Sequence, residues 1–341
     1  MARQVKRAFR CRFYPTDEQA AELSRTFGCA RLAYNRALEA RTRAWYGEQR
    51  RVSYVETSAM LTAWKKTPDL AFLVSGPLDI VWSGHLPEGA EPSTVTVSRD
   101  AAGRWFVSLL CDDTITRLNP ADRAVGIDAG VTSLVTLSTG EKVTNPRHER
   151  RDRERLARAQ RDLSRKAKGS KNREKARVRV ARIHARIADR RRDLLHQLTT
   201  RLVHENQVVV IEDLHVAGMV RNHRLARAIS DAAWRDLRTM LEYKADWYGR
   251  ELVVIDRWFP SSKLCGDCGT VAGSMPLNVR QWECGCGAVH DRDINAAKNV
   301  LAAGLAVSAC GADVRPKRRE PGGQSATKQE TRPARVGVPR H

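Results

Sequence analysis

Four consecutive β-branched residues, Val208 to Ile211, constrain the fold of this 341-residue chain more than any other feature. A strand with one face in water alternates apolar and polar residues, whereas a run as apolar as this one is typical of a strand buried on both faces. Glu212 follows the run directly. Because open sheets place their sites at the carboxyl ends of strands, we expect Glu212 to lie at such an edge.

Two other segments each present one acidic residue in a comparable setting. In AVGIDAGVTSLVTLS, apolar runs are separated by Gly130 and by STG, a pattern of consecutive antiparallel strands with tight turns, so Asp128 is predicted to lie on the first strand. In HDRDINAAKNV, Asp293 precedes the helix-forming run from Ala296 to Leu305, and the segment is predicted to begin a helix. Only folding could bring these distant carboxylates together.

Three carboxylates that converge repel each other, and the repulsion costs stability unless cations neutralise it. Clusters of oxygen ligands suit Mg²⁺ or Mn²⁺. Two such ions roughly 4 Å apart can activate a water on one side of a phosphodiester and stabilise the leaving oxygen on the other. Any one of these residues alone would more often be a surface carboxylate or a helix cap. The hypothesis of a metal-dependent nuclease therefore rests on all three together.

The charge of the chain agrees with a nucleic-acid partner. Its net charge of +21 and pI near 10.2 point to a polyanion. No 18-residue apolar stretch is present, and the beginning, MARQVKRAFRCRFYP, lacks the apolar core of a signal peptide. Neither secretion nor membrane insertion is supported, and we expect a cytoplasmic location, associated with the bacterial nucleoid.

Four of the eight cysteines cluster in CGDCG and WECGCG, whereas the others are scattered singly. Two close pairs, Cys265 with Cys268 and Cys284 with Cys286, can form a tetrahedral thiolate site for Zn²⁺ in a reducing compartment. The second pair has one intervening residue where two is commoner, and His290 is close enough to be an alternative ligand. Four thiolates leave no open coordination position, so we expect this zinc to stabilise the fold and do no chemistry.

A very basic stretch lies between the first two carboxylate segments. From Arg147 to Arg201 there are 21 Lys plus Arg against 7 Asp plus Glu, so this short segment carries most of the net charge. Apolar residues recur there at three-, four- and seven-residue intervals on two sides of a break at KGSKN, which predicts a helical hairpin. A charge run on a helix is usually a solvated face. Here the imbalance is too one-sided for self-pairing, and we expect phosphate contacts from Arg177, Arg179, Arg182 and Arg186.

The N-terminal third is predicted to combine strands with one helix. Strands are expected at Ala8 to Tyr14 and in a hairpin from Thr94 to Leu110 that turns at Gly103. A helix is expected from Glu18 to Ala44, capped by Thr16.

Aromatic side chains on or beside that helix could stack on bases, but are more often core, and core is the interpretation we favour for them. They are Tyr14, Phe27, Tyr34 and Trp45. From Cys310 onward the chain is rich in Arg, Pro, Gly, Ser and Thr, and should be a disordered basic tail.

These motifs together resemble one family, the TnpB (OrfB) proteins of bacterial insertion sequences, which are RNA-guided nucleases related to type V CRISPR effectors. RFYPTDEQAAELSRTFGCARLAYNRAL is similar to the family's opening and GIDAGV to its first RuvC motif. IEDLHVAGMVRNHRLARAISDAAWRDLRTMLEYKADWYG is similar to the second motif, and CGDCG with WECGCGAVHDRDINAAKNV to the zinc ribbon and the third. The resemblance covers almost the whole chain.

The resemblance implies an α/β protein with an RNase H-like (RuvC) nuclease core, a helical insertion and a zinc ribbon. It also implies an N-terminal β-barrel, the wedge domain, which carries an inserted helical recognition domain. The family's catalytic residues fall on Asp128, Glu212 and Asp293, and its zinc ligands fall on the four clustered cysteines. Asp293 is chosen over Asp291 because the family's acid precedes x-Asn-Ala/Gly, here Ile294-Asn295-Ala296.

The implied order of domains is a wedge and recognition region at 1–120, RuvC parts at 121–146, 206–262 and 291–309, the basic hairpin at 147–205, the ribbon at 263–290 and the tail at 310–341. One departure from the family falls in the first of these. Leu73 is followed by VSGP and then directly by Leu78-Asp79-Ile80, where the family continues with a helix, a basic loop and further strands. We therefore expect the recognition and wedge region to be shortened, with target unwinding affected and the chemistry kept.

The leading hypothesis is an RNA-guided, Mg²⁺-dependent DNA endonuclease of a bacterial insertion sequence, with a guide RNA encoded at the transposon's right end. The guide would select double- or single-stranded target DNA by base pairing, while the protein would contact a short flanking motif. One alternative is an RNA-guided DNA-binding protein that represses without cutting, although relatives of that type usually lose a RuvC acid. Another is a degenerate transposon remnant with impaired cleavage.

Overall fold

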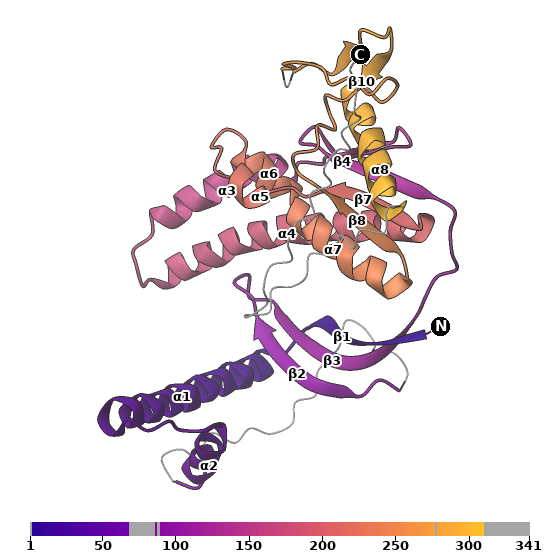
Figure 1. The fold of residues 1–341 in the computed structure, drawn as a ribbon. Coiled ribbons are helices and arrows are strands. Elements are labelled where there is room, and N and C mark those ends of the chain that lie inside the picture. Colours follow the sequence, from indigo (N-terminus) through magenta and orange to yellow (C-terminus); the bar gives the residue numbers. More distant parts are fainter. Residues whose placement is uncertain (1, 68–85, 87–88, 277, 310–341) are drawn as a thin grey trace.

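The computed structural model describes residues 2–67, 86, 89–276 and 278–309, and it has two main parts (Figure 1). The first, called here the N-terminal module, comprises the described residues up to Thr116. The second, the core, contains a five-stranded sheet with helices on both faces. A small cysteine-bearing hairpin sits at the far end of the core, beside the start of the last helix. The predicted mixed α/β fold is confirmed. The predicted tail and the expected shortening after Leu73 lie outside the described residues.

The core sheet has the strand order β6-β5-β4-β7-β8. Strands β4, β5 and β6 pair antiparallel in sequence order, as predicted, whereas β4 pairs parallel with β7 and β7 pairs parallel with β8. The strands are β4 (Ala124–Ala129), β5 (Ser133–Leu137), β6 (Lys142–Thr144), β7 (Val208–Glu212) and β8 (Glu251–Ile255).

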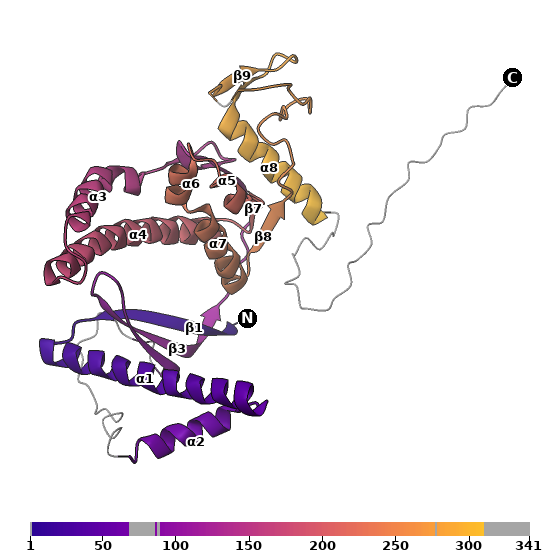
Figure 2. The same ribbon diagram turned by 90° about the vertical axis from the view of Figure 1, so that its left-hand side faces the viewer.

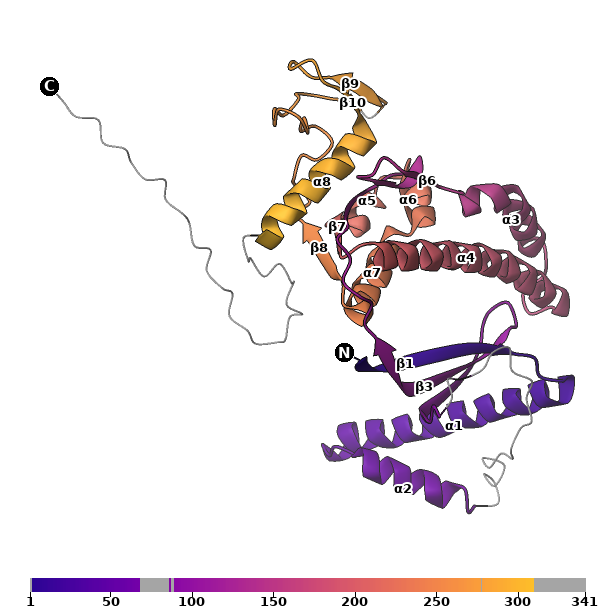
Figure 3. The same cartoon turned by 90° about the vertical axis from the view of Figure 1, so that its right-hand side faces the viewer.

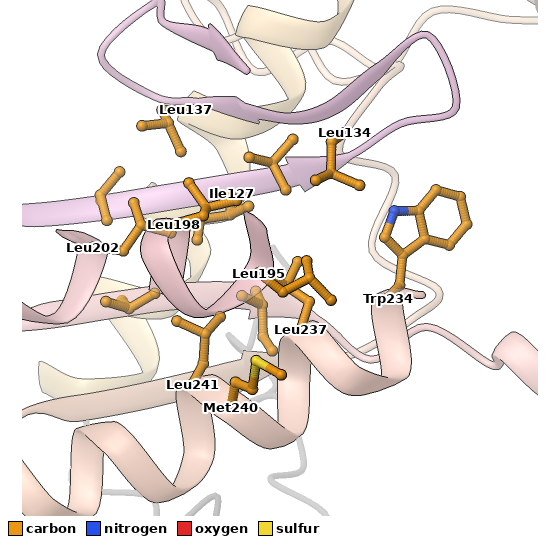
Figure 4. Packing of buried hydrophobic residues seen from close by; sticks show 14 of the residues in the cluster. Ile127, Leu134, Leu137, Leu195, Leu198, Leu202, Trp234, Leu237, Met240 and Leu241 are labelled. Atoms are coloured by element: carbon orange, nitrogen blue, oxygen red, sulfur yellow. The ribbon is translucent and has the colours of Figure 1, made fainter. Parts of the chain in front are cut away.

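Strand β7 is buried on both faces, which confirms the prediction from its β-branched run. On one face, Val209 and Ile211 join a large apolar cluster with residues of α4 (Lys171–Glu205), α6 (Ala226–Ala232) and α7 (Trp234–Tyr248). Figure 4 shows side chains of this cluster, Leu198, Leu237 and Leu241 among them, interleaved between the helices and the sheet. On the other face, Val210 packs against Val300 of α8 (Arg292–Ala309). Helix α8 therefore covers the second face at β7, and Phe259 packs against the same cluster (Figure 3).

Helix α8 lies very close to the sheet because two glycines leave room for it. A methyl group at Gly126 of β4 would clash with the backbone of Ala297 and Leu301, and one at Gly304 would clash with the side chain of Val210. This close packing fixes the position of α8, which carries Asp293 in its first turn.

The basic stretch forms the predicted helical hairpin, of α3 (His148–Ser164) and α4. Leu156 and Ala159 of α3 pack on Ile183 and Ile187 of α4. The second half of α4 continues into the main core, where Leu198 and Leu202 are buried. The short helix α5 (Val216–Met219) and α6 then follow β7 along the chain.

The N-terminal module contains a three-stranded antiparallel sheet of order β1-β3-β2, and one long helix lies along it (Figure 2). The strands are β1 (Ala2–Phe13), β2 (Pro92–Arg99) and β3 (Trp105–Thr116), and the helices are α1 (Asp17–Glu48) and α2 (Tyr54–Trp64). The predicted turn at Gly103 is confirmed, with φ +82°, as is the cap of α1, where Thr16 and Gln19 form a capping box. The sheet is open in the described part of the chain, so the barrel implied by the resemblance stays a prediction.

The interpretation of the helix-associated aromatics as core was wrong. Exposed fractions are 56% for Tyr14, 37% for Phe27, 68% for Tyr34 and 42% for Trp45. Phe27 stacks on Trp105 at 5.6 Å between ring centroids, but the other three rings lie largely open to solvent. An apolar residue on a helix is buried only if a partner covers that face, and in the described residues the sheet and α2 together cover only part of α1.

Polar contacts join the module to the core. Arg3 of β1 pairs with Asp246 of α7, and Arg104 pairs with Asp189 of α4. The Leu118 N–H donates to the carbonyl of Tyr248 at 3.1 Å. None of the described helices is both long enough and apolar enough to span a bilayer.

Candidate functional site

The sheet and α8 bring the three candidate acids to one edge. Asp128 lies near the end of β4 and Glu212 is the last residue of β7. These strands are parallel neighbours with Ile127 opposite Ile211, so the two acids that follow are neighbours as well. Asp293 is in the first turn of α8, which packs on β4 and β7. Asp128 and Glu212 lie at the carboxyl ends of two buried strands, the edge at which the sequence predicted a site.

The acidity of Asp128 is strongly perturbed. Burial, followed by the charges of Glu212 and Asp293, raises the pKa of Asp128 from 3.8 to about 7, against the opposing charges of Arg292 and Arg280. Ionising Asp128 is therefore unfavourable in the protein alone. A cation bound at this edge would offset both the burial and the repulsion, so the site has the electrostatic character of a cation site.

Glu212 is held by a hydroxyl that sequence analysis missed. Burial raises the pKa of Glu212, and a hydrogen bond donated by the Ser261 hydroxyl to Oε1 opposes that rise. Ser261 is itself buried, and its carbonyl accepts a hydrogen bond of 2.8 Å from Asn299 of α8. A serine in the loop after β8 thus connects a carboxylate of the sheet to the helix that carries the third acid.

Asp293 is surrounded by two cations that sequence analysis also missed. Arg280 donates to Oδ1 of Asp293 at 3.1 Å, and Lys142 Nζ lies 3.9 Å from Oδ2. In the described residues, the carboxylate oxygens of the three acids do not all lie within 4.8 Å of one another. The groups of possible metal ligands that meet this distance all contain cysteines. The acids are therefore electrostatically coupled, with Asp293 ion-paired to protein cations.

Asp291, the competing candidate, is held by the start of α8 and by Lys142. Its Oδ1 accepts hydrogen bonds of 3.1 Å from the backbone N–H groups of Asp293 and Ile294, which makes it the cap of α8. Its Oδ2 accepts a hydrogen bond of 2.7 Å from Lys142. Burial raises the pKa of Asp291, but Lys142 and these N–H groups outweigh burial and the net pKa is lowered. Asp291 is not among the groups that perturb Asp128.

The four clustered cysteines converge as predicted. The sulfur atoms of Cys265, Cys268, Cys284 and Cys286 all lie within 4.8 Å of one another. The second pair lies in the turn between β9 (Gln281–Glu283) and β10 (Val289–Asp291), and the first pair comes before β9. Two of the S···S distances are 3.8 Å and 3.6 Å. Tetrahedral coordination with metal–sulfur bonds of about 2.3 Å places sulfurs about 3.8 Å apart, so the cluster can hold a metal.

His290, the alternative ligand, contacts one of these sulfurs. Its Nε2 is 3.0 Å from Cys265 Sγ, shorter than the S···S distances, which is hydrogen-bond geometry. His290 also forms a possible metal-ligating group with Cys265 and Asp267, so the choice between His290 and the four thiols stays a prediction.

The cysteine cluster is tied directly to α8. Asn295 and Asn299 each donate a hydrogen bond of 2.7 Å to the carbonyl of Leu264, next to the first cysteine. The Gly266 N–H donates to Oδ1 of Asn295 at 3.1 Å. Because Asn295 is two residues after Asp293, the conformation of the cluster and the position of the third acid are coupled.

The four candidate arginines of the hairpin are all exposed. Arg177 pairs with Glu174, and Arg179 pairs with Asp162 at 3.3 Å. Arg182 and Arg186 have no acidic partner within the described residues. Self-pairing therefore accounts for part of the hairpin's charge and leaves a cationic surplus on its surface.

Comparisons with known proteins place this architecture in a family. Residues 99–223 match the OrfB family of IS605 elements, described as "Probable transposase", and residues 234–300 match the Cas12f1-like TNB domain. Residues 1–50 match the helix-turn-helix domain of the same OrfB family, although β1 and the single helix α1 occupy this region here. A candidate RNA-guided DNA endonuclease of Streptomyces pristinaespiralis is 63% identical, and the alignment covers 100% of each chain. The candidate RNA-guided DNA endonuclease InsQ of Escherichia coli K12 is 29% identical over 92% of this chain and 97% of its own length.

Among solved structures, the Cas12f1 chain in a complex with sgRNA and target DNA matches with a TM-score of 0.45 and 16% identity, over 77% of this chain and 50% of that one. The Streptomyces alignment spans 401 positions, whereas this chain has 341 residues, so the relative carries a longer sequence somewhere along its length. With the near-complete alignment to that relative and the two OrfB matches, the resemblance stands: this chain belongs to the OrfB (TnpB) family of IS605-type elements.

Proposed function

We propose that this protein is an RNA-guided, Mg²⁺-dependent DNA endonuclease that cuts guide-matched DNA with a single RuvC site. The observation that carries the proposal is Asp128, whose pKa is raised to about 7 by burial and by the two neighbouring carboxylates. A buried acid that resists ionisation beside two others is expected where a bound cation completes the site. The names of the Streptomyces and Escherichia relatives support the same activity.

The sheet supports an RNase H-like core. In that arrangement an antiparallel three-stranded unit is extended by two parallel strands, which is the order β6-β5-β4-β7-β8. The acids at the ends of β4 and β7, with a third on α8, suit a RuvC site. The domain divisions at 120, 146, 205, 262, 290 and 309 are part of this proposal, as is action on DNA in the bacterial cytoplasm.

Asp128, Glu212 and Asp293 would hold the Mg²⁺, or Mn²⁺, and all-oxygen donors suit these ions. Bound there, the metal would supply Lewis-acid activation of the attacking water and stabilisation of the leaving oxygen. Ser261 orients Glu212 through its hydroxyl. Arg280 and Lys142 hold the carboxylate of Asp293 and bring positive charge to the place where the phosphate would approach.

The guide RNA would bind to the N-terminal module and the basic hairpin. Guanidinium groups lie over exposed rings in the module, with Arg12 4.7 Å from the centre of Tyr14 and Arg51 5.8 Å from that of Trp45. Such pairs of cations and open rings suit backbone contacts and base stacking. We propose that the RNA comes from the transposon's right end, and that the hairpin arginines contact its phosphates or those of the target.

The first experiment tests the three acids. Alanine at Asp128, Glu212 or Asp293 should each reduce metal-dependent cleavage of guide-matched DNA below detection while RNA affinity is kept. Asp213→Ala is the matched control, since Asp213 adjoins Glu212 but pairs with Arg238 and Arg257. Cleavage that survives Asp293→Ala and is lost in Asp291→Ala would show that the third acid was wrongly assigned.

Sequencing the RNA that co-purifies with the protein tests the guide. One scaffold with a variable end would support RNA-guided function, and a heterogeneous mixture would contradict it. A discrete guide in a wild-type protein that binds matched DNA without cutting it would instead identify the RNA-guided repressor. We see no observation that favours the repressor, because all three acids are present.

We also propose that Zn²⁺ occupies the cysteine cluster as a structural ion. The purified protein should retain one zinc, and Cys265→Ser should lose it and cut more slowly, because the cluster is tied to Asn295 beside Asp293. Cys11→Ser, in the N-terminal module, is the control. Metal analysis that finds no zinc in active wild-type protein would remove this part of the proposal.

A further inference from the structure

A cavity of about 510 Å³ is lined by arginines that the proposed function does not use. Its walls come from the loop after β4, from the segment that joins β6 to the first turns of α3, and from α6 with the residues just before it. We call it the arginine pocket, after Arg147, Arg150, Arg153, Arg224 and Arg227.

The two acids in the pocket wall are engaged by other groups. Glu149 accepts a hydrogen bond of 2.7 Å from Arg153. Asp231, which is buried, accepts one of 2.8 Å from Arg191 and another of 3.0 Å from the Glu149 N–H. Asp231 thereby joins α3, α4 and α6 and forms a fixed floor to the pocket.

Four lining arginines remain without an acidic partner within ion-pair distance in the described part of the chain: Arg147, Arg150, Arg224 and Arg227. Such a concentration of guanidinium groups is repulsive unless anions join it. Guanidinium forks match the oxygens of a phosphate in geometry as well as in charge. The pocket is therefore built for an anion with phosphate-like oxygens.

The segment between β6 and α3 holds one of these arginines in an unfavourable backbone conformation. Arg147 has φ +49°, in the left-handed region of backbone conformation that residues other than glycine rarely adopt. Its N–H donates to Oδ1 of Asn145 at 3.1 Å, and Nδ2 of Asn145 donates to the carbonyl of Val131 at 3.0 Å. Val131 is three residues after Asp128, so a short chain of contacts connects the pocket to the first acid.

The other wall of the pocket is connected to the second acid. The segment with Arg224 and Arg227 follows Glu212 along the chain, through α5. Both walls are thus anchored to the edge of the sheet where the acids lie, and Figure 1 shows α3, α5 and α6 grouped on that side of the core.

We propose that the arginine pocket binds a backbone phosphate of the DNA strand that is cut, near the scissile phosphate, and so holds that strand in register with the acids. This inference rests on the proposed function, because it assigns the pocket to the strand in the active site. Its ligand is a phosphodiester, and the pocket makes no base contacts that would select sequence.

The test couples individual protein charges to individual DNA phosphates. Each single-stranded or pre-melted target would carry one neutral methylphosphonate, placed at a different position around the cut in each member of the series. Three proteins would be compared on these targets: wild type, the pocket variant Arg224→Ala/Arg227→Ala, and the control variant Arg155→Ala/Arg158→Ala. The control removes the same charge from exposed sites on α3 that do not line the pocket. Guide-RNA affinity and thermal melting would be measured for all three proteins.

One methylphosphonate position should weaken wild-type binding about tenfold, the size of a lost charged hydrogen bond. A methylphosphonate at that position should not weaken DNA binding by the pocket variant, and should weaken binding by the control variant as much as it weakens binding by wild type. The pocket variant should raise KM for cleavage while kcat changes little. A loss of guide-RNA affinity alone, or a pocket variant that behaves like the control, would each overturn the inference. If wild type does not cut, the proposed function fails, while the binding measurements still decide whether the pocket holds DNA.

Discussion

The two sheets of this molecule are covered to very different degrees. In the core, Val209 and Val210 are fully buried from opposite faces, and helices lie on both sides of the strands. In the N-terminal module, one long helix covers the sheet, and only Leu23 and Ala44 of the 32 residues of α1 are buried. Tyr34 and Tyr46 on that helix are 68% and 77% exposed.

This difference teaches that the two regions obtain their order from different sources. The core buries its own apolar residues and needs no partner to do so. The module exposes rings and guanidinium groups together, an arrangement expected of a surface completed by nucleic acid. We therefore expect core substitutions to act on folding and module substitutions to act on RNA binding.

The test with the largest expected effect truncates one side chain in each region, Leu241 in the core and Tyr34 in the module. Leu241 is fully buried in the core cluster, so Leu241→Ala should lower the free energy of unfolding by about 2–5 kcal/mol. Tyr34→Ala should leave unfolding almost unchanged and weaken RNA binding by about 1–3 kcal/mol, as expected for one stacked base. Denaturant melts and RNA titrations of both variants give the comparison. A Tyr34→Ala protein that is strongly destabilised would break it.

A buried lysine makes the stability of the core depend on pH. Lys244 of α7 is 5% exposed and donates to the carbonyl of His196 and to the hydroxyls of Thr199 and Thr200 at 2.7–2.8 Å. Burial lowers its pKa from 10.5 to about 8.

The folded state therefore releases this proton before the unfolded state does. Lys244 should destabilise the protein fully below pH 8, and stability should rise between pH 8 and 10.5, by at most roughly 3 kcal/mol. Lys244→Met should flatten this part of the profile, measured by denaturant midpoints at each pH. An unchanged slope in Lys244→Met would assign the effect to another group.

Replacing one glycine by alanine in each region should change stability in opposite directions. Gly126→Ala should destabilise the core by about 1–3 kcal/mol, because the new methyl group meets the backbone of α8, and should reduce cleavage by moving Asp293. Gly28→Ala, in α1, places its methyl group in open space and should stabilise the module by about 1 kcal/mol through helix propensity. Thermal melts of the two variants would separate the regions, and the same sign for both would contradict the packing argument.

The test with the smallest expected effect examines whether the surface of the α3–α4 hairpin binds nucleic acid, as we expect of the N-terminal module. Neutralising two of Arg177, Arg179, Arg182 and Arg186 should reduce the slope of log K against log salt for RNA or DNA by roughly one unit per lost contact, with little change in melting. An unchanged slope would make this surface a solvated face and restrict nucleic-acid contacts to other parts of the chain.

The sequence predicted the core sheet and the cysteine cluster well because local patterns determine them. The run from Val208 to Ile211 can be satisfied only by burial on both faces, and two close cysteine pairs need only a hairpin to converge. Ser261, Arg280 and Lys142 could not be predicted in the same way. Each reaches its acid from a loop or strand whose position depends on the whole fold. The roles of Asp128, Glu212 and Asp293 stay predictions, carried by the geometry and the family.

The aromatics of α1 were misassigned for a physical reason. Helical periodicity shows which residues share a face, but it does not show what covers that face. The same ambiguity applies to the α3–α4 hairpin. Its sequence shows an excess of basic residues but does not show what those residues contact. Tertiary contacts resolve such cases, as they did for Phe27 against Trp105.

The turn between α3 and α4 divides the candidate active site along the chain. Gly169 lies in this exposed turn, at the tip of the hairpin, with Asp128 before it and Glu212 and Asp293 after it. A chain cut there would yield two fragments, neither of which holds a full set of acids. The seam of α3 against α4 and the pairing of β4 with β7 would guide their reassembly. The hairpin is therefore a natural place to build a split enzyme, in which activity requires two separately expressed pieces to meet.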